Sequence, residues 1–533
     1  MTVARNSGRL VAAALLLGCV TLLLTAVTGG LSPSLIEADE GAHYVNALFL
    51  GDWLRAGLPS PLPFAQDFYA HFPRLTIGHW PPGWYMIEAP LFAVVRPSPL
   101  GAACLSAILS GLPGVAIVWA FARVERPRLG LVLGLAYAVL PLVVESARYL
   151  LVDQPVALVV ALAAMAWAAA SDRPTWPRLL CFALLAAACP LIKGNGALVA
   201  LVPAIDIALT GRWRLLRHPG LWAAAMLAIV IVAPWYWLSF GIAAEGFNYA
   251  PGLAYNALSL EENGRAVLAN VGAAGLLLAL VGLASLAPGA APAERRVARL
   301  AVSVVVATIA FQSAVPAALA ARYLTPLLPW LVVLAGLGLV QLARLSGLGQ
   351  AAAVALAIAA LVPAATTLAT LPAKPDLGAP RLADAMVRRG GLWLVDGRSG
   401  AEGALIAAGA YADGGRRRIW VGRASQWLST SDFMGDAYRL TARDPAAVRN
   451  VLDRIGAAGT ASVALHNQPA FPHSRLLEIA VSNGAYRLTR QRFRRGDGEI
   501  MVADRLVPVT PNVALLAADS GSAKVARMTN ALR

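Results

Sequence analysis

The chain has 533 residues, of which 58% are hydrophobic and only 14% charged, and its mean hydropathy is +0.64. Soluble globular proteins carry about a quarter charged residues, so this composition excludes an ordinary soluble protein and predicts a membrane protein. The formal net charge of +15 does not indicate nucleic-acid binding, because the basic residues fall in short clusters between apolar runs and in the C-terminal part.

The first apolar run extends from Leu10 to about Val27 and follows Arg5 and Arg9. A signal peptide also begins with basic residues, but this run is long and lacks a clean small-x-small cleavage pattern. We therefore predict an uncleaved anchor with a cytoplasmic N-terminus. The four cysteines lie inside apolar runs without metal-type spacing, which favours helix packing over a disulfide framework.

Eleven apolar runs are long enough to cross a bilayer. They lie at roughly 9–29, 99–121, 128–146, 154–171, 177–192, 195–211, 220–240, 266–287, 299–316, 324–343 and 348–371. A further region, 80–97, contains Pro81, Pro82, Pro90 and Glu88. If it does not cross, every basic connector falls on the side of the N-terminus, as the positive-inside rule requires. We therefore predict that 80–97 is a juxtamembrane or re-entrant element and that loop 30–98 lies outside.

The sequence after about residue 372 has a different character. Short apolar runs at 391–396, 418–422, 461–466 and 499–504 predict strands, and 381–389, 445–455 and 472–481 predict helices. This alternation indicates a small extracytoplasmic α/β domain at 373–512, in which we find no nucleotide-binding glycine loop, and 513–533 is predicted to be a flexible tail. The predicted fold class is therefore mainly α, with a polytopic transmembrane bundle at 1–372 and a small C-terminal α/β domain.

The first outer loop is long and rich in polar groups, and long loops of this kind tend to be functional. It contains the adjacent acids Asp39 and Glu40, which can supply acid/base or metal chemistry. The structural alternative is an acidic turn that caps a helix beginning near Gly41. The loop also holds His43, His71 and His79, so a His/carboxylate metal site is a further alternative, although no pair has diagnostic spacing.

Charged residues also stand at the borders of later spans on the predicted outer side. Asp153 opens a span two residues before Pro155, where a helix dipole alone would favour an acid. Lys193 lies between two spans and Arg322 precedes another. Outer-side cations run against the positive-inside rule and usually have an anionic partner, which can be a lipid phosphate or a buried carboxylate.

The order of these motifs resembles the GT-C glycosyltransferases. The nearest branch holds the aminoarabinose-lipid A transferase, the rhizobial galacturonosyltransferases and the protein O-mannosyltransferases. The resemblance covers roughly residues 9–345. It rests on Ala38-Asp39-Glu40-Gly41, His79-Trp80-Pro81-Pro82, Arg148-Tyr149-Leu-Leu-Val-Asp153, Ile192-Lys193-Gly194, Ala233-Pro234-Trp235-Tyr236 and Arg322-Tyr323-Leu-Thr-Pro326.

The resemblance implies a multi-pass enzyme of a bacterial inner membrane that takes a sugar from a polyprenyl phosphate and transfers it to a lipid, glycan or protein acceptor on the outer face. Asp39 would be the catalytic carboxylate with Glu40 beside it, and Asp153 would be a second acid. The implied substrate-binding residues are Lys193, Arg322, Tyr323, Arg148, Tyr149 and His79. A divalent metal ion, if present, would be held by Asp39, Asp153 and His43.

Chemistry favours inversion at the sugar, because a glycosyl phosphate already carries a good leaving group. The protein has only to neutralise the departing phosphate and to activate an acceptor hydroxyl. A transporter or flippase of lipid-linked sugars is the main alternative, and a scaffold that has lost the chemistry is another. Transporters tend to place charges near the bilayer midplane within repeated halves. Here the acids lie at loop–span borders and no clear repeat is visible, which favours the enzyme.

Overall fold

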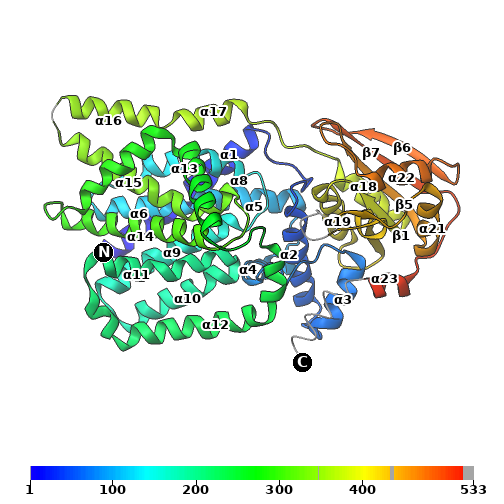
Figure 1. The fold of residues 1–533 in the computed structure, drawn as a ribbon, viewed down its shortest axis with the longest axis horizontal. Helices are drawn as coiled ribbons and strands as arrows, with labels where there is room; N and C mark the ends of the chain where they lie inside the picture. Colours follow the sequence, from blue (N-terminus) through cyan, green and yellow to red (C-terminus); the bar gives the residue numbers. More distant parts are fainter. Residues whose placement is uncertain (1, 346, 432–436, 520–533) are drawn as a thin grey trace. The chain divides into compact units, whose positions relative to one another are not determined.

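The computed structural model describes residues 2–345, 347–431 and 437–519 (Figure 1). The chain divides into two compact units. The helical unit comprises Met1–Thr28, Leu105–Arg148 and Val152–Pro372. The mixed unit comprises Gly29–Cys104, Tyr149–Leu151 and Ala373–Arg533, so the first outer loop belongs to the same compact unit as the C-terminal α/β part.

The helical unit is built from long apolar helices joined by short connections, several of them 3-10 turns. Its helices are α1 (Thr2–Val27), α6 (Val115–Arg123), α7 (Pro127–Ala138), α8 (Pro141–Ser146), α9 (Asp153–Asp172), α10 (Trp176–Ile192), η2 (Gly194–Ala200), α11 (Leu201–Thr210), α12 (Pro219–Ala243), α13 (Leu253–Gly282), α14 (Pro292–Ala314), η6 (Ala321–Leu327), α15 (Leu328–Ala343), α16 (Leu348–Ala359) and α17 (Val362–Thr370). Helix α5 (Pro99–Gly111) and the turn η1 (Leu112–Gly114) lead into α6.

Eight helical segments of the described residues are long and apolar enough to cross a membrane. They are Gly8–Val27, Pro99–Arg123, Asp153–Asp172, Pro219–Gly246, Leu253–Leu286, Pro292–Ala314, Ala321–Ala343 and Leu348–Thr370. The other three predicted spans coincide with the shorter apolar helices Pro127–Ala138, Trp176–Ile192 and Gly194–Thr210. Region 80–97 forms the 12-residue helix α4 (Gly83–Val94), which is not among the candidate spans. The chain is therefore a multi-pass membrane protein.

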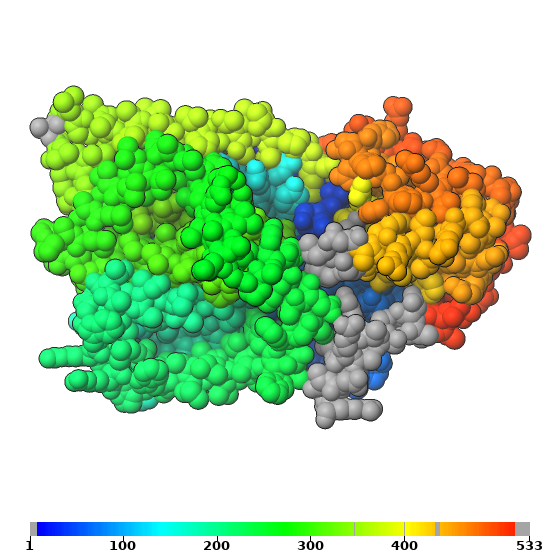
Figure 2. Space-filling view, in the orientation of Figure 1, coloured from blue at the N-terminus to red at the C-terminus, as the bar shows by residue number. Residues whose placement is uncertain are grey.

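Two segments of the helical unit expose large apolar side chains over most of their length. In α12 these include Trp222, Ile229 and Trp237, and in α16 they include Leu348 and Ile358. Both segments lie on the surface in the space-filling view (Figure 2). Apolar surface of this extent is unfavourable in water but favourable against lipid chains, which supports a membrane location for this unit.

The mixed unit contains a five-stranded sheet in the order β2-β1-β5-β7-β6. The strands are β1 (Gly391–Asp396), β2 (Ile419–Arg423), β5 (Ala457–Leu465), β6 (Tyr486–Arg492) and β7 (Gly498–Arg505), and the short strands β3 (Ser429–Thr430) and β4 (Arg439–Leu440) form a separate pair. Strand β1 pairs in parallel with both β2 and β5, whereas β7 pairs antiparallel with β5 and β6. The helices are α2 (Glu40–Arg55), α3 (Pro61–His71), α4, α18 (Ala379–Arg389), α19 (Ser399–Asp413), α20 (Ala424–Trp427), α21 (Pro445–Ile455), α22 (Pro472–Val481) and α23 (Val513–Asp519).

Apolar side chains fill both faces of this sheet. Leu392 and Leu394 of β1 share a core with Leu452 of α21 and Leu477 of α22. Successive strand residues point to opposite faces, so Trp393 points to the other side, where α19 packs against β1. The predicted α/β character of the C-terminal part is therefore confirmed. Of the predicted flexible tail, residues 513–519 form α23 and 520–533 lie outside the described residues.

Helices α2 and α19 cross at glycines and approach backbone to backbone. A Cβ atom on Gly41 would lie 2.5 Å from the carbonyl oxygen of Gly403, and a Cβ atom on Gly400 would lie 1.8 Å from that of Ile36. A larger residue at Gly41 would force the two helices apart, and one at Gly400 would push α19 away from the segment that precedes α2. This contact fixes the start of α2, and with it the acidic pair, on the α/β part.

Candidate active site

Asp39 and Glu40 stand where loop 30–98 enters α2. The main-chain carbonyl of Asp39 accepts hydrogen bonds from the amides of Ala42 and His43, at 3.0 Å each, so the residue stands at the helix N-cap. Its side chain makes no capping hydrogen bond. The simple helix-cap interpretation therefore does not account for the Asp39 carboxylate, which is partly exposed while Glu40 is fully buried.

The Glu40 carboxylate is held by three donors. Its Oε1 accepts hydrogen bonds from Lys374 Nζ at 2.6 Å and from the Leu150 amide at 2.9 Å, and its Oε2 accepts one from the Glu37 amide at 2.9 Å. The side chains of Glu40 and Lys374 are 0% and 1% exposed. A buried carboxylate with a cation and two amides already bound is suited to positioning Asp39 rather than to moving protons.

Arg74 is a second cation beside Asp39, and the sequence-based prediction did not include it. Its guanidinium donates a hydrogen bond to the carbonyl of Ala38, the residue before Asp39. Burial and the charge of Arg423 lower the pKa of Arg74 to about 10, while Glu402 and Asp39 oppose that shift. Arg74 therefore stays positively charged near neutral pH and places positive charge next to the loop acid.

The histidines of the outer loop are packed in aromatic surroundings. His43 is buried, its Nδ1 lies 2.6 Å from the Tyr85 hydroxyl, and its ring centroid is 5.1 Å from that of Trp80. Burial raises the pKa of Tyr85, so the hydroxyl keeps its proton and can donate to His43. His79 makes an edge-on contact with Trp80, with 5.2 Å between centroids. His43 and His79 thus shape the loop that follows Asp39.

Asp153 anchors a charged cluster within the helical unit. It opens α9 and is 1% exposed, and its Oδ1 accepts a hydrogen bond from Lys193 Nζ at 2.5 Å. Its Oδ2 lies 4.0 Å from Nε of Arg322, and Lys193 Nζ lies 4.3 Å from the ring centroid of Tyr323. The structure thus brings together four predicted residues from three separate motifs. Asp153 is the anionic partner of Lys193. For this lysine the structure therefore shows a buried carboxylate, which was the alternative to a lipid phosphate.

Lys193 occupies a break between two helices. Helix α10 contains Pro190 and ends at Ile192, which leaves carbonyl groups of its last turn without helical partners. The Tyr236 hydroxyl of α12 donates a hydrogen bond to the Pro190 carbonyl at 2.8 Å. Tyr236 therefore closes the end of the helix that carries Lys193, a role that its motif alone did not reveal.

The predicted substrate-binding residues Arg148 and Tyr149 have mainly structural neighbours. Arg148 is buried and donates hydrogen bonds to the carbonyls of Thr28 and Pro372, at the ends of two transmembrane segments. The Tyr149 ring lies 5.1 Å from Lys374 Nζ and so covers the Glu40–Lys374 pair. These contacts suit a framework around the acids.

Comparisons with known proteins find one partial family match and several structures with a similar fold. The family model described as dolichyl-phosphate-mannose-protein mannosyltransferase matches residues 81–237, less than half of the chain, a stretch that contains Asp153, Lys193 and Tyr236. ArnT from Cupriavidus metallidurans, solved bound to undecaprenyl phosphate, is similar in structure with a TM-score of 0.53 and 15% identity, covering 93% of this chain and 99% of that one. No curated protein matches the chain in sequence.

A second group of solved structures comes from the Archaeoglobus fulgidus oligosaccharyltransferase. Its complex with Zn and sulfate has a TM-score of 0.51 and 12% identity, with 84% of this chain and 67% of that chain covered. Both groups of structures align with most of this chain and not only with a single motif. The fold is that of the GT-C glycosyltransferases.

The metal ligands predicted from the GT-C resemblance are divided between the two units, with Asp39 and His43 in the mixed unit and Asp153 in the helical unit. His43 Nδ1 already faces Tyr85 and Asp153 already binds Lys193. Among the described residues, metal-type side chains instead gather at Asp396, Glu402 and His473, a set that the sequence did not indicate.

Proposed function

We propose that the chain is a glycosyltransferase that moves a sugar from a polyprenyl-phosphate donor to a hydroxyl of a lipid, glycan or protein acceptor, with inversion at the sugar. The GT-C fold along more than nine-tenths of the chain supports this proposal. So do the ligands of the related structures, undecaprenyl phosphate for ArnT and dolichol-phosphate for the archaeal oligosaccharyltransferase. The observation that carries it is the charged cluster around Asp153.

This cluster has more positive than negative charge. Lys193 and Arg322 contribute +2 and Asp153 contributes −1, so the three side chains sum to +1. Lys193 is buried against Asp153, whereas the Arg322 side chain is 24% exposed. A guanidinium binds phosphate through paired hydrogen bonds, so Arg322 is the group that we assign to the donor phosphate, with Lys193 and Asp153 holding it in place.

Asp39 supplies the other half of the proposed chemistry. Its carboxylate accepts the proton of the acceptor hydroxyl while that oxygen attacks the anomeric carbon of the sugar. The bond between the anomeric carbon and the phosphate oxygen breaks, and the polyprenyl phosphate leaves with the bonding electrons. Arg322 stabilises the charge on the leaving phosphate, and Glu40 positions Asp39. A single displacement of this kind inverts the anomeric configuration.

We place this activity at the outer face of a bacterial inner membrane, with a cytoplasmic N-terminus and the α/β part outside. The clustering of basic connectors on one predicted side supports this orientation. We do not assign a divalent metal ion to Asp39, Asp153 and His43, because His43 Nδ1 faces Tyr85 and Asp153 binds Lys193. The steps assigned to Asp39 and Arg322 do not depend on such an ion.

The deciding experiment compares the wild type with Asp39→Asn in purified protein supplied with polyprenyl-phosphate sugars and an envelope extract as acceptor. A general base typically contributes about 100- to 10,000-fold, so we expect kcat to fall by that order in the variant. Asp384→Asn, on the exposed face of α18, is the matched control and should transfer normally. Normal transfer by Asp39→Asn would overturn the role of Asp39. Movement of the donor across vesicles without any transfer would instead identify a flippase.

A further inference from the structure

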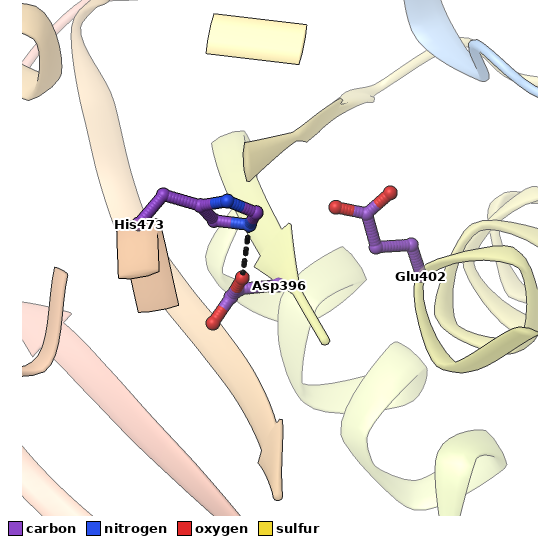
Figure 3. Close-up of side chains that lie close together, drawn as sticks. All are labelled: Asp396, Glu402 and His473. Atoms are coloured by element: carbon purple, nitrogen blue, oxygen red, sulfur yellow. Dashed lines mark ion pairs between the residues drawn. The ribbon is translucent and has the colours of Figure 1, made fainter. Parts of the chain in front are cut away.

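Three buried side chains of the mixed unit converge in the α/β part. They are Asp396 at the end of β1, Glu402 in the first turn of α19 and His473 in the first turn of α22 (Figure 3). Their exposed fractions are 1%, 0% and 1%, and one potential ligand atom from each lies within 4.8 Å of the others. These residues have no part in the proposed transfer of sugar.

The order of the strands explains why these side chains meet. Strand β1 has parallel neighbours on both sides, β2 and β5. Helix α19 leaves β1 toward β2, whereas α22 follows β5, so the chain turns in opposite directions from this edge of the sheet. In α/β sheets ligands bind outside the carboxyl ends of the strands at such a switch point. Asp396 stands at this point.

The contacts of His473 fit a metal ligand better than an ordinary hydrogen-bonded histidine. Its Nδ1 lies 2.9 Å from the Tyr438 hydroxyl. Its Nε2 lies 3.2 Å from Asp396 Oδ1, yet it makes no hydrogen bond to any described residue. Metal-bound histidines typically fix one ring nitrogen with a hydrogen bond and direct the other to the ion. Two ligands about 2.1 Å from a tetrahedral Zn²⁺ lie about 3.4 Å apart, close to the separation of these two atoms.

The remaining contacts orient the two carboxylates. Ser474 Oγ donates a hydrogen bond to Asp396 at 2.9 Å. Glu402 accepts hydrogen bonds from Arg423 Nε at 2.8 Å and from the amide and hydroxyl of Ser425. Glu402 has two cationic neighbours, Arg423 and Arg74, whereas the neighbours of Asp396 in the described part of the chain are a hydroxyl and an imidazole, so a neutral His473 leaves the charge of Asp396 unopposed. An uncompensated buried charge is costly, and a bound cation removes that cost.

A cavity reaches this cluster at Asp396. It has a volume of ≈ 90 Å³, and Asp396, Ser462, Phe471 and Ser474 are among its lining residues. A metal site needs suitable ligands, a supporting second shell and a path of entry. The ligands are Asp396, Glu402 and His473. Tyr438 and Ser474 support them with hydrogen bonds, and the cavity provides the path of entry.

We propose that Asp396, His473 and Glu402 bind one divalent transition-metal ion of the Zn²⁺ type. One imidazole and two carboxylates form a mixed nitrogen and oxygen set that suits Zn²⁺ and its spectroscopic substitute Co²⁺. The ion links β1, α19 and α22. Helix α19 packs against α2. The ion therefore also stiffens the support of α2, the helix that begins at Glu40.

The test uses the full-length protein with its purification tag removed, stripped with a chelator and then titrated with Co²⁺. We expect visible d–d absorption bands that saturate at one Co²⁺ per chain, and one Zn²⁺ per chain by mass spectrometry. Asp396→Asn and His473→Gln should lose both signals. His466→Gln is the matched control, because His466 pairs with Asp497 at an exposed position of the same unit.

Tyr438→Phe provides a variant that keeps all three ligands. Loss of a second-shell hydrogen bond typically weakens metal affinity by about 10- to 100-fold, so this variant should bind Co²⁺ more weakly at unchanged stoichiometry. Full stoichiometry in a folded His473→Gln protein would overturn the proposal. So would a wild type that shows no saturable Co²⁺ bands, in which case Asp396 and His473 form an ion pair only. Neither readout depends on transferase activity.

Discussion

In the described part of each unit, one buried lysine is paired with a buried acid. In the mixed unit Lys374 Nζ lies 2.6 Å from Glu40, and in the helical unit Lys193 Nζ lies 2.5 Å from Asp153. The two pairs use the same chemistry at nearly the same distance. Their surroundings differ, because Glu40 is completed by two main-chain amides whereas Asp153 has a second cation, Arg322.

We propose that this difference separates a structural pair from the phosphate-binding site assigned above. Around Glu40 the charges of acid and lysine cancel, and the remaining donors are uncharged. Around Asp153 one positive charge remains, and it lies on a partly exposed guanidinium. We therefore expect changes at the first pair to act on stability, and changes at the second cluster to act on binding of the donor phosphate.

Replacing Lys374 should have the largest effect on stability. Lys374→Met leaves Glu40 buried with its charge unpaired, and breaking a buried pair in this way costs about 3–5 kcal/mol. We expect a marked fall in Tm, measured in detergent as the temperature at which half of the protein stays monodisperse. The double variant with Glu40→Leu should recover much of that loss, because an apolar replacement of a buried pair is often tolerated.

Arg265→Met is the matched control for this measurement. Arg265 pairs with Glu261 and Glu262 on α13, where all three side chains are exposed. Exposed pairs contribute about 0–1 kcal/mol, so the Tm should barely change. An unchanged Tm in Lys374→Met would mean that the Glu40–Lys374 pair does not stabilise the protein. The proposed difference between this pair and the Asp153 cluster would then be wrong.

Replacing Arg322 should have an intermediate effect, seen in binding rather than in stability. Hydrogen bonds to charged groups contribute about 1.5–3 kcal/mol, so Arg322→Gln should weaken binding of undecaprenyl phosphate by roughly 10- to 150-fold. The Tm should stay close to that of the wild type. Titration of the purified protein with the lipid in nanodiscs measures this directly. Wild-type affinity in the variant would remove the proposed phosphate site.

The smallest effect is a pH dependence confined to the mixed unit. Burial lowers the pKa of His71, whose Nδ1 lies 2.7 Å from the Ile419 carbonyl and whose ring stacks on Trp420 at 4.6 Å. A histidine with a lowered pKa contributes stability that is present above its ordinary value of about 6.5 and is lost as the pH falls. The Tm of the wild type should therefore fall between pH 7 and pH 5, and that of His71→Asn should fall less. If the Tm of the wild type and that of His71→Asn fell equally over this pH range, His71 would not be the source of the pH dependence.

Much of the fold could be predicted because the signals are local. Apolar runs predicted the transmembrane helices, and the strands at 391–396 and 499–504 were found within a residue or so at each end. Strand β6 was missed because Tyr486–Arg492 is an exposed edge strand with few apolar residues. Helix α19 was missed because its glycines oppose helix formation by propensity. One of them, Gly400, is needed for the close approach of α19 to Ile36.

The site was less predictable, because its contacts join distant parts of the chain. The sequence singled out Asp39, Asp153, Lys193 and Arg322, and the structure brings the last three together. It gave no sign that Lys374 would neutralise Glu40, because the two residues are 334 positions apart in the chain. Arg74 and His473 were missed for the same reason, because their partners are not neighbours in sequence.

The Glu40–Lys374 hydrogen bond also sets a time order for biosynthesis. Its partners are 334 residues apart, and the Arg495 side chain reaches back across 464 residues to the Leu31 carbonyl. At about 5–20 residues per second, a ribosome needs roughly 17 to 67 s to add the residues between Glu40 and Lys374. Throughout that interval the acid lacks its lysine. A nascent chain therefore cannot complete the acidic loop until synthesis has passed the last transmembrane segment.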